Sequence, residues 1–89
     1  MKRIRTTGRF ERRLAAFAKR HPELLDAVEV AIDSLARGES LTSLRAHRLH
    51  GDLAGCYAAR IGSAYRLIFI IEDDAVGLID IGTHDEVYR

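Results

Sequence analysis

Arg60 and Arg66 are the residues of this sequence that most directly suggest chemistry. Residues Tyr57–Ile61 and Tyr65–Ile71 are rich in β-branched and aromatic side chains, which predicts two strands joined by a three-residue turn. In that hairpin Arg60 lies opposite Arg66, because directly paired residues sit about 4.5–5.5 Å apart at Cβ on one face of the sheet. Two adjacent guanidinium groups repel each other, so the pattern predicts an anion between them.

The anion is either a carboxylate of the protein or a phosphate, and the residues alone leave both open. Asp52, Asp85 or Glu86 could fold back and form a structural salt-bridge cluster with the two arginines. A phosphate suits them equally well, because the planar guanidinium fork meets two phosphate oxygens at once.

Histidines and a tyrosine near the end of the sequence are the other candidates. His84 follows a predicted strand and either exchanges a proton near neutral pH or is simply exposed. Tyr88 either packs against the sheet or stacks on a base and donates a hydrogen bond to a phosphate. His47 and His50 precede the hairpin, but no histidines show metal-ligand spacing and Cys56 is the only cysteine. The sequence therefore predicts neither a metal site nor a cofactor.

Length and composition predict one domain over residues 1–89 with an ordinary apolar fraction of 47%. Its net charge of +1 hides an asymmetry, because ten of the 14 Lys and Arg but only six of the 13 Asp and Glu lie in the first 45 residues. A basic first half fits nucleic acid or an acidic protein as a partner. No stretch resembles a membrane span of about 20 apolar residues or a secretory signal, so we expect a cytoplasmic protein without a membrane partner.

The apolar spacing of the first half predicts a strand and two helices. Residues 2–6 predict an edge strand, after which Thr7 or Gly8 caps a helix. Its core face recurs at Phe10, Leu14 and Phe17. Pro22 opens a second helix, which ends at Gly38 and whose apolar stripe is Leu24, Leu25, Val28, Ile32 and Leu35. Helices joined so closely predict an antiparallel helical hairpin.

The second half predicts three antiparallel strands. A turn at residues 72–75 leads to a third strand over residues 76–82, pairing Phe69 with Leu78 and Ile68 with Ile79, after which the sequence runs straight off the strand. Residues 39–53 show no clear period. The order βααβββ predicts an α+β fold in which a helical hairpin packs on a small, mainly antiparallel sheet.

The whole sequence resembles the RelE/ParE superfamily of small toxins from type II toxin–antitoxin systems. Residues 47–57 match its L-x-G-x-L-x-G-x-aromatic segment, and residues 60–69 match its paired R-I and Y-R-L-I-F strands. Residues 82–88, Gly-Thr-His-Asp-Glu-Val-Tyr, match an ending closest to the YafQ-like and YoeB-like branches. The resemblance covers all the predicted elements in the expected order.

The resemblance implies a RelE/ParE-like domain that cuts messenger RNA, usually in the ribosomal A site and without a metal. It also implies a cognate antitoxin as partner, with messenger RNA and the ribosome and its 16S rRNA as targets. Positions that match the superfamily's catalytic residues are His47, Arg60, Arg66, His84 and Tyr88. YafQ-like relatives carry a histidine where Arg60 stands and an aspartate near Ala64, so the set mixes two branches.

These residue types suit RNA cleavage, because RNA carries its own nucleophile, the 2′-OH. We predict His84 or His47 as base, the other histidine or Tyr88 as acid, and the two arginines as a phosphate clamp, giving a 2′,3′-cyclic phosphate. The first helix either presents a solvated basic face or binds ribosomal RNA through Arg9, Arg12, Arg13, Lys19 and Arg20.

Two other functions remain open on the sequence alone. A ParE-like toxin would inhibit DNA gyrase by binding it, without nuclease activity. A domain that still binds its antitoxin but has lost toxicity would do neither.

Overall fold

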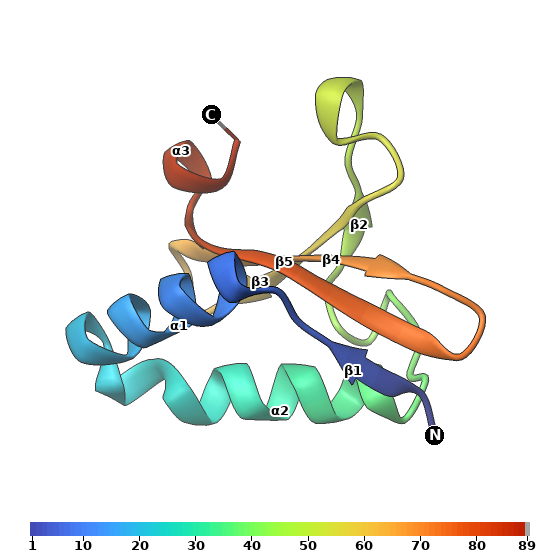
Figure 1. The fold of residues 1–89 in the computed structure, drawn as a ribbon, viewed down its shortest axis with the longest axis horizontal. Coiled ribbons are helices and arrows are strands. Elements are labelled where there is room, and N and C mark those ends of the chain that lie inside the picture. Colours follow the sequence, from blue (N-terminus) through green and yellow to red (C-terminus); the bar gives the residue numbers. More distant parts are fainter. Residues whose placement is uncertain (89) are drawn as a thin grey trace.

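The α+β prediction is confirmed by the structure, a computed structural model that describes residues 1–88 (Figure 1). Its elements are, in order, β1 (Arg3–Arg5), α1 (Gly8–Arg20), η1 (Pro22–Leu24), α2 (Leu25–Ala36), β2 (His47–Arg48), η2 (Gly51–Leu53), β3 (Tyr57–Ile61), β4 (Tyr65–Ile71), β5 (Ala75–Thr83) and α3 (His84–Val87). Helix α1 begins after the Thr7 cap, whose side chain accepts a hydrogen bond from the Phe10 amide. No helix within residues 1–88 is long and apolar enough to cross a membrane.

The five strands form one sheet in the order β1-β5-β4-β3-β2. β1 is parallel to β5, and the other neighbours are antiparallel. Helices α1 and α2 lie on one side of the sheet, whereas α3 and the β2–η2 segment rise from the other (Figure 1). The sequence analysis missed β2, because two residues are too few to show a period of two.

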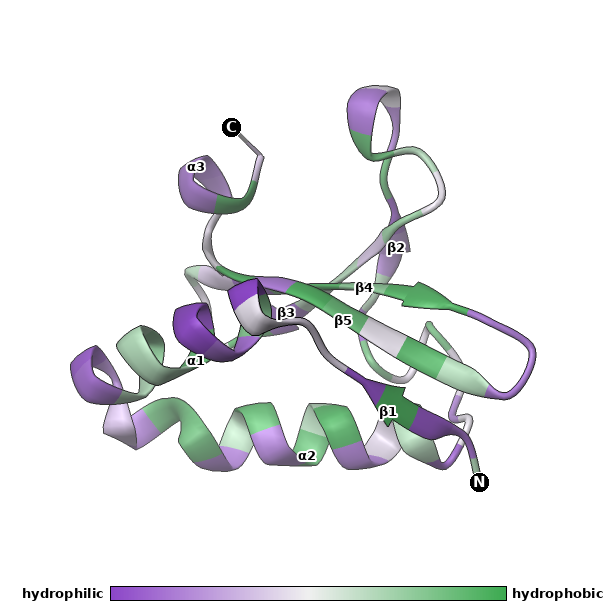
Figure 2. Cartoon of the chain, in the orientation of Figure 1, coloured by the Kyte–Doolittle hydropathy of each residue, from purple (hydrophilic) through white to green (hydrophobic). Residues whose placement is uncertain are grey.

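Hydrophobic side chains cover both faces of the central strands, because the strand residues that point to either side of the sheet are largely apolar. The larger cluster lies under α1 and α2 and includes Phe10, Phe17, Leu35, Leu67 and Phe69. A smaller cluster on the opposite face is Ala58, Ile68 and Val87, and Val87 belongs to α3. Figure 2 shows hydrophobic residues along β4, β5 and α2 and hydrophilic ones over much of α1 and α3.

The strand register agrees with prediction in all but one pair. Arg60 pairs with Arg66 and Ile61 with Tyr65, as the three-residue turn requires, and Phe69 pairs with Leu78. The predicted pairing of Ile68 with Ile79 is wrong. A β-bulge lies between Ile68 and Phe69 in the ladder, so that Ile68 pairs with Asp80 and Ile79 is the extra residue.

The prediction that the chain runs straight off the last strand is also wrong. Thr83 caps the short helix α3, and Glu86 completes a capping box with it. Four helical residues are too few for a periodicity to show, but the sequence Thr-x-x-Glu at residues 83–86 is a start signal that could have predicted the helix.

Asp80 anchors α1 to β5 through a buried carboxylate that the sequence analysis did not single out. Its side chain is 7% exposed, accepts a hydrogen bond from Arg13 Nε at 2.7 Å, and lies 3.5 Å from Arg9 Nη2. It also accepts the Ile81 amide hydrogen bond at 2.8 Å. We expect Asp80→Ala to lower the free energy of unfolding by about 2 kcal/mol, because the charge-assisted hydrogen bonds of a buried carboxylate are lost, whereas its partner Arg13 is partly exposed and stays solvated. Urea denaturation measures this loss.

Asp74→Ala is the matched control for the Asp80 variant. Asp74 pairs with Arg3 at 3.1 Å, but both side chains are more than 70% exposed. Its removal should cost less than about 1 kcal/mol, since surface ion pairs contribute little. Equal midpoints for the two variants would show that the Asp80 cluster does not hold α1 on the sheet.

Candidate active site

A cavity of about 520 Å³ opens on the face of the sheet that α1 and α2 leave uncovered. Its walls come from α3 and from the β2–η2 segment, which stand apart above the sheet (Figure 1). The residues that line it are His47, Arg48, Leu49, His50, Asp52, Leu53, Arg66, His84 and Tyr88. Four of the five predicted catalytic residues therefore share one cavity, although the first and the last, His47 and Tyr88, are 41 positions apart in the sequence.

Arg66 lies on β4 within this cavity and is half-buried. Its Nη1 donates a hydrogen bond to the Tyr65 carbonyl at 3.1 Å. Within residues 1–88 no carboxylate forms an ion pair with it, including the three that the sequence suggested, Asp52, Asp85 and Glu86. A guanidinium group with most of its donors free is suited to bind a phosphate that enters the cavity.

Arg60 lies outside this cavity, although it pairs with Arg66 across the ladder. It lines a separate cavity of about 380 Å³, whose other lining residues include Ala27 of α2 and Arg45. β2 pairs only with the first two residues of β3, so the end of β3 that carries Arg60 is an open edge of the sheet. The expected side-by-side arrangement of the two guanidinium groups in one site is thus not what the structure shows.

Arg48 supplies a second cation to the larger cavity, and the sequence analysis missed it. Its Cζ lies 5.9 Å from the centre of the Tyr57 ring, close enough for a cation–π contact that orients the side chain. The available signal was its position directly after His47 in the segment that resembles the toxin superfamily.

His84 and Tyr88 meet on the α3 wall. Their ring centres are 4.4 Å apart at an interplanar angle of 65°, and the Tyr88 amide donates to the His84 carbonyl at 3.1 Å. The His84 side chain is 69% exposed, with Nδ1 at 3.5 Å from a carboxylate oxygen of Asp85. His47 and His50 lie on the β2–η2 wall, so both walls of the cavity that Arg66 lines carry groups that can exchange protons.

The basic residues of α1 do not reach this cavity, because α1 lies on the other side of the sheet (Figure 1). Arg9 and Arg13 hold Asp80, as described above. Arg12 and Lys19 are exposed, and no ion pair to another residue in the described part of the chain is formed by either. Arg20 lines a different cavity that also contains Glu86.

Glu86 is an exposed carboxyl group whose pKa is lowered by its hydrogen bonds and by nearby charges. The Thr83 backbone N–H, which donates to its carboxylate, lowers the pKa of Glu86 most, and the charges of Arg13 and Arg20 lower it further. The Glu86 carboxylate is therefore charged at neutral pH. Within residues 1–88, no group of three or more His, Cys, Asp or Glu side chains is placed to hold a metal ion.

The sequence and the fold both resemble those of known bacterial toxins. Residues 2–89 match the sequence profile of a family described as the bacterial toxin of type II toxin–antitoxin system, YafQ. YafQ from E. coli strain BL21(DE3) has a similar structure, with a TM-score of 0.82 at 16% identity over 100% of both chains. The E. coli DinJ–YafQ toxin–antitoxin complex matches with a TM-score of 0.82 at 17% identity, covering 99% of this chain and 98% of that one.

A third similar structure comes from another branch. The YoeB–YefM complex from Staphylococcus aureus matches with a TM-score of 0.78 at 18% identity, covering 94% of this chain and 98% of that one. At these identities the structural matches show that the fold is shared. A comparison with curated protein sequences found no match.

Proposed function

The chain belongs to the YafQ family of bacterial type II toxin–antitoxin toxins, and from this premise we propose that it is an mRNA interferase, an endoribonuclease that cuts messenger RNA. The observation that carries the proposal is the shared cavity, in which Arg66, His47, His84 and Tyr88 converge. The reaction needs no more than a base, an acid and a cation, because the RNA 2′-OH is the nucleophile. We propose that it proceeds without a metal.

Arg66 is the proposed phosphate ligand, because it lines the cavity and no carboxylate within residues 1–88 forms an ion pair with it. Arg48 is the second cation of the site, and Arg60 contributes less because it lies outside the cavity. Charge that builds on the phosphorus oxygens in the transition state is stabilised by these fixed donors.

His84 or His47 removes the 2′-OH proton, and the other histidine or Tyr88 protonates the leaving 5′-oxygen. The 2′-oxygen forms the new bond to phosphorus as the bond to the 5′-oxygen breaks, so the products carry a 2′,3′-cyclic phosphate and a free 5′-OH. Groups on opposite walls suit the two proton transfers, because attacking and leaving oxygens lie roughly in line. The pairing of His84 with Tyr88 orients the imidazole on its wall.

Cleavage of messenger RNA in the presence and absence of ribosomes tests the proposal. We expect discrete cuts by primer extension, with termini that carry a 2′,3′-cyclic phosphate. Cleavage of free RNA should continue when EDTA is present, because no metal takes part in the proposed reaction. We further expect ribosomes to increase the rate, since we propose that the toxin acts in the A site. Intact RNA under both conditions would overturn the proposal.

Assays of the same purified protein on RNA and on DNA gyrase distinguish the proposed function from two alternatives. A ParE-like toxin would inhibit DNA supercoiling by gyrase and leave RNA intact, and none of the proteins compared above supports that reading. A domain without toxicity would leave both RNA and gyrase unaffected, and cells that express it would grow normally.

A cognate antitoxin is the proposed protein partner, and the cytoplasm, where messenger RNA is translated, is the proposed place of action. The E. coli and S. aureus structures named above contain YafQ with DinJ and YoeB with YefM. Co-expression with the adjacent reading frame should therefore yield a complex in which RNA cleavage is suppressed.

The exposed basic side of α1 is proposed to bind ribosomal RNA through Arg12 and Lys19, with Arg20 at its end. We expect the double variant Arg12→Gln/Lys19→Gln to weaken ribosome binding and to flatten the plot of log affinity against log salt by about one to two units, because each phosphate contact releases counterions. Binding measured at several salt concentrations gives that slope.

Arg3→Gln/Arg37→Gln is the control of equal net charge. Arg3 is paired with Asp74 and Arg37 with Glu39, so neither is free for a phosphate. The same slope for the two double variants would mean that α1 does not contact the ribosome.

A further inference from the structure

α3 is too short to be stable alone, although it carries His84 and Tyr88 into the proposed site. A helix of four residues has hardly begun to form its internal hydrogen bonds, and nucleation of a free helix is unfavourable. Its position must therefore come from contacts with the rest of the protein. Only Val87 of α3 is buried, and it joins the small cluster with Ala58 and Ile68.

A reciprocal pair of hydrogen bonds fixes the start of α3. The Thr83 amide donates to Glu86 Oε1 at 2.8 Å, and the Glu86 amide donates to Thr83 Oγ1 at 3.2 Å. Together they close the first turn at the point where β5 ends. Because His84 directly follows Thr83, these bonds also set the direction in which its imidazole leaves the sheet.

Gly82 makes room for this arrangement. A Cβ at position 82 would lie 2.8 Å from Glu86 Oε1 and 3.1 Å from Glu86 Cβ, so a larger residue must displace the glutamate. Gly82 is also the residue that pairs with Arg66 across β4 and β5. The glutamate that closes the turn therefore packs on the backbone next to the proposed phosphate ligand.

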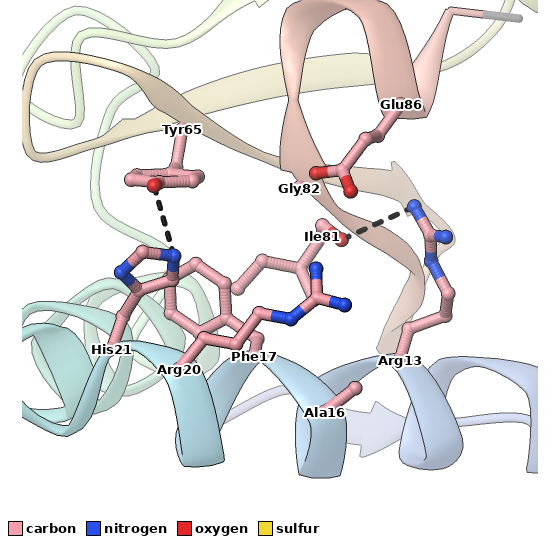
Figure 3. A pocket seen from close by; sticks show the side chains of 9 residues that line it. All are labelled: Arg13, Ala16, Phe17, Arg20, His21, Tyr65, Ile81, Gly82 and Glu86. Carbon is pink, nitrogen blue, oxygen red and sulfur yellow. Dashed lines mark hydrogen bonds between the residues drawn. The ribbon is translucent and has the colours of Figure 1, made fainter.

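Glu86 also lines a cavity of about 180 Å³ on the α1 side of the sheet, together with Arg13 and Arg20. In Figure 3 its carboxylate points toward the guanidinium group of Arg13, which donates to the Ile81 carbonyl at 3.5 Å, and Arg20 reaches toward the same space. Both arginines, with the Thr83 N–H, lower the pKa of Glu86. The stabilisation of α3 by the charged Glu86 carboxylate is therefore present at neutral pH. It is lost as the pH falls through the lowered pKa of Glu86.

We propose that Thr83 and Glu86 are positioning residues, which hold α3 in the orientation that presents His84 and Tyr88 to the cavity, and that Gly82 is the residue that makes this packing possible. The proposal rests on the proposed nuclease function of the cavity. Neither side chain lines the cavity, so both act through α3 and do not touch the RNA.

Paired substitutions at Thr83 test the proposal. Thr83→Val keeps the shape but removes the hydroxyl, so we expect kcat for RNA cleavage to fall about tenfold, the size of a lost helix cap, with KM nearly unchanged. Thr83→Ser retains the cap and should restore most of kcat. Wild-type kcat in Thr83→Val, or an equal loss in Thr83→Ser, would overturn the proposal.

A double-mutant cycle tests the role of Gly82. Gly82→Ala should lower kcat in the wild-type background and should lower it less in the Glu86→Ala background, because the closest of its contacts, the one at 2.8 Å with Glu86 Oε1, is then removed while the contact with the Cβ of residue 86 remains. Glu86→Gln, whose amide oxygen can still accept from the Thr83 N–H, should be milder than Glu86→Ala. Fully additive effects of Gly82→Ala and Glu86→Ala would contradict the proposed packing.

The orientation of α3 can be measured by NMR, independently of RNA cleavage. The close approach of the His84 and Tyr88 rings should give proton–proton NOEs in the wild-type protein. We expect these to weaken in Thr83→Val and to persist in Thr83→Ser, while urea midpoints show that both variants are folded. A wild-type protein that shows the NOEs but cuts no RNA would refute the nuclease function alone, and unchanged NOEs in Thr83→Val would refute the positioning role alone.

Discussion

Replacing Arg66 with alanine should reduce RNA cleavage by about 10³-fold or more, the effect expected when the cation that stabilises a phosphoryl transition state is removed. Arg66 is half-buried in the cavity, and the only hydrogen bond that its side chain forms within residues 1–88 is the one to the Tyr65 carbonyl. Its removal therefore takes away a phosphate ligand and breaks no ion pair in that part of the chain. Cleavage under single-turnover conditions measures the loss, and an unchanged urea midpoint shows that the fold is intact.

Two matched variants sharpen this result. Arg66→Lys keeps the charge without the planar fork and should recover only part of the rate. Arg60→Ala removes the residue opposite Arg66 in the ladder, but it should cost much less, since Arg60 lies in a different cavity. Cleavage by Arg66→Ala at the wild-type rate would refute the phosphate role. An equal loss in Arg60→Ala would show that RNA draws both arginines into one site.

Replacing His84 with alanine should lower the cleavage rate by about 10²–10⁴-fold, the usual contribution of a positioned acid or base. The imidazole is 69% exposed and rests on the Tyr88 ring, so it can exchange a proton with a substrate in the cavity. Single-turnover cleavage assays measure the loss.

His21→Asn is the control for the His84 variant. His21 lies in the cavity on the α1 side, where its Nε2 is 2.9 Å from the Tyr65 hydroxyl (Figure 3). His21→Asn should retain the wild-type cleavage rate. A His84→Ala protein that cuts RNA at the wild-type rate would assign the proton transfers to His47 and Tyr88.

Local patterns in the sequence predicted most of the elements and one critical pairing. The apolar period of α1 predicted the buried positions Phe10 and Phe17, and the three-residue turn predicted the pairing of Arg60 with Arg66. These features depend on residues close together in the chain, where periodicity and turn length determine the outcome. The motif at residues 82–88, which resembles the C-terminal motif of YafQ-like toxins, indicated the correct family. The match of residues 2–89 to the YafQ family profile confirms it.

The tertiary structure alone decided which charged residues meet. The pairing of Arg60 with Arg66 did not determine where the long Arg60 side chain lies, because β2 leaves that end of β3 open. Likewise, one extra residue in β5 shifted the pairing with β4, so that Asp80 lies opposite Ile68. Contacts between distant segments depend on how whole elements pack, and no local pattern of residues encodes that packing.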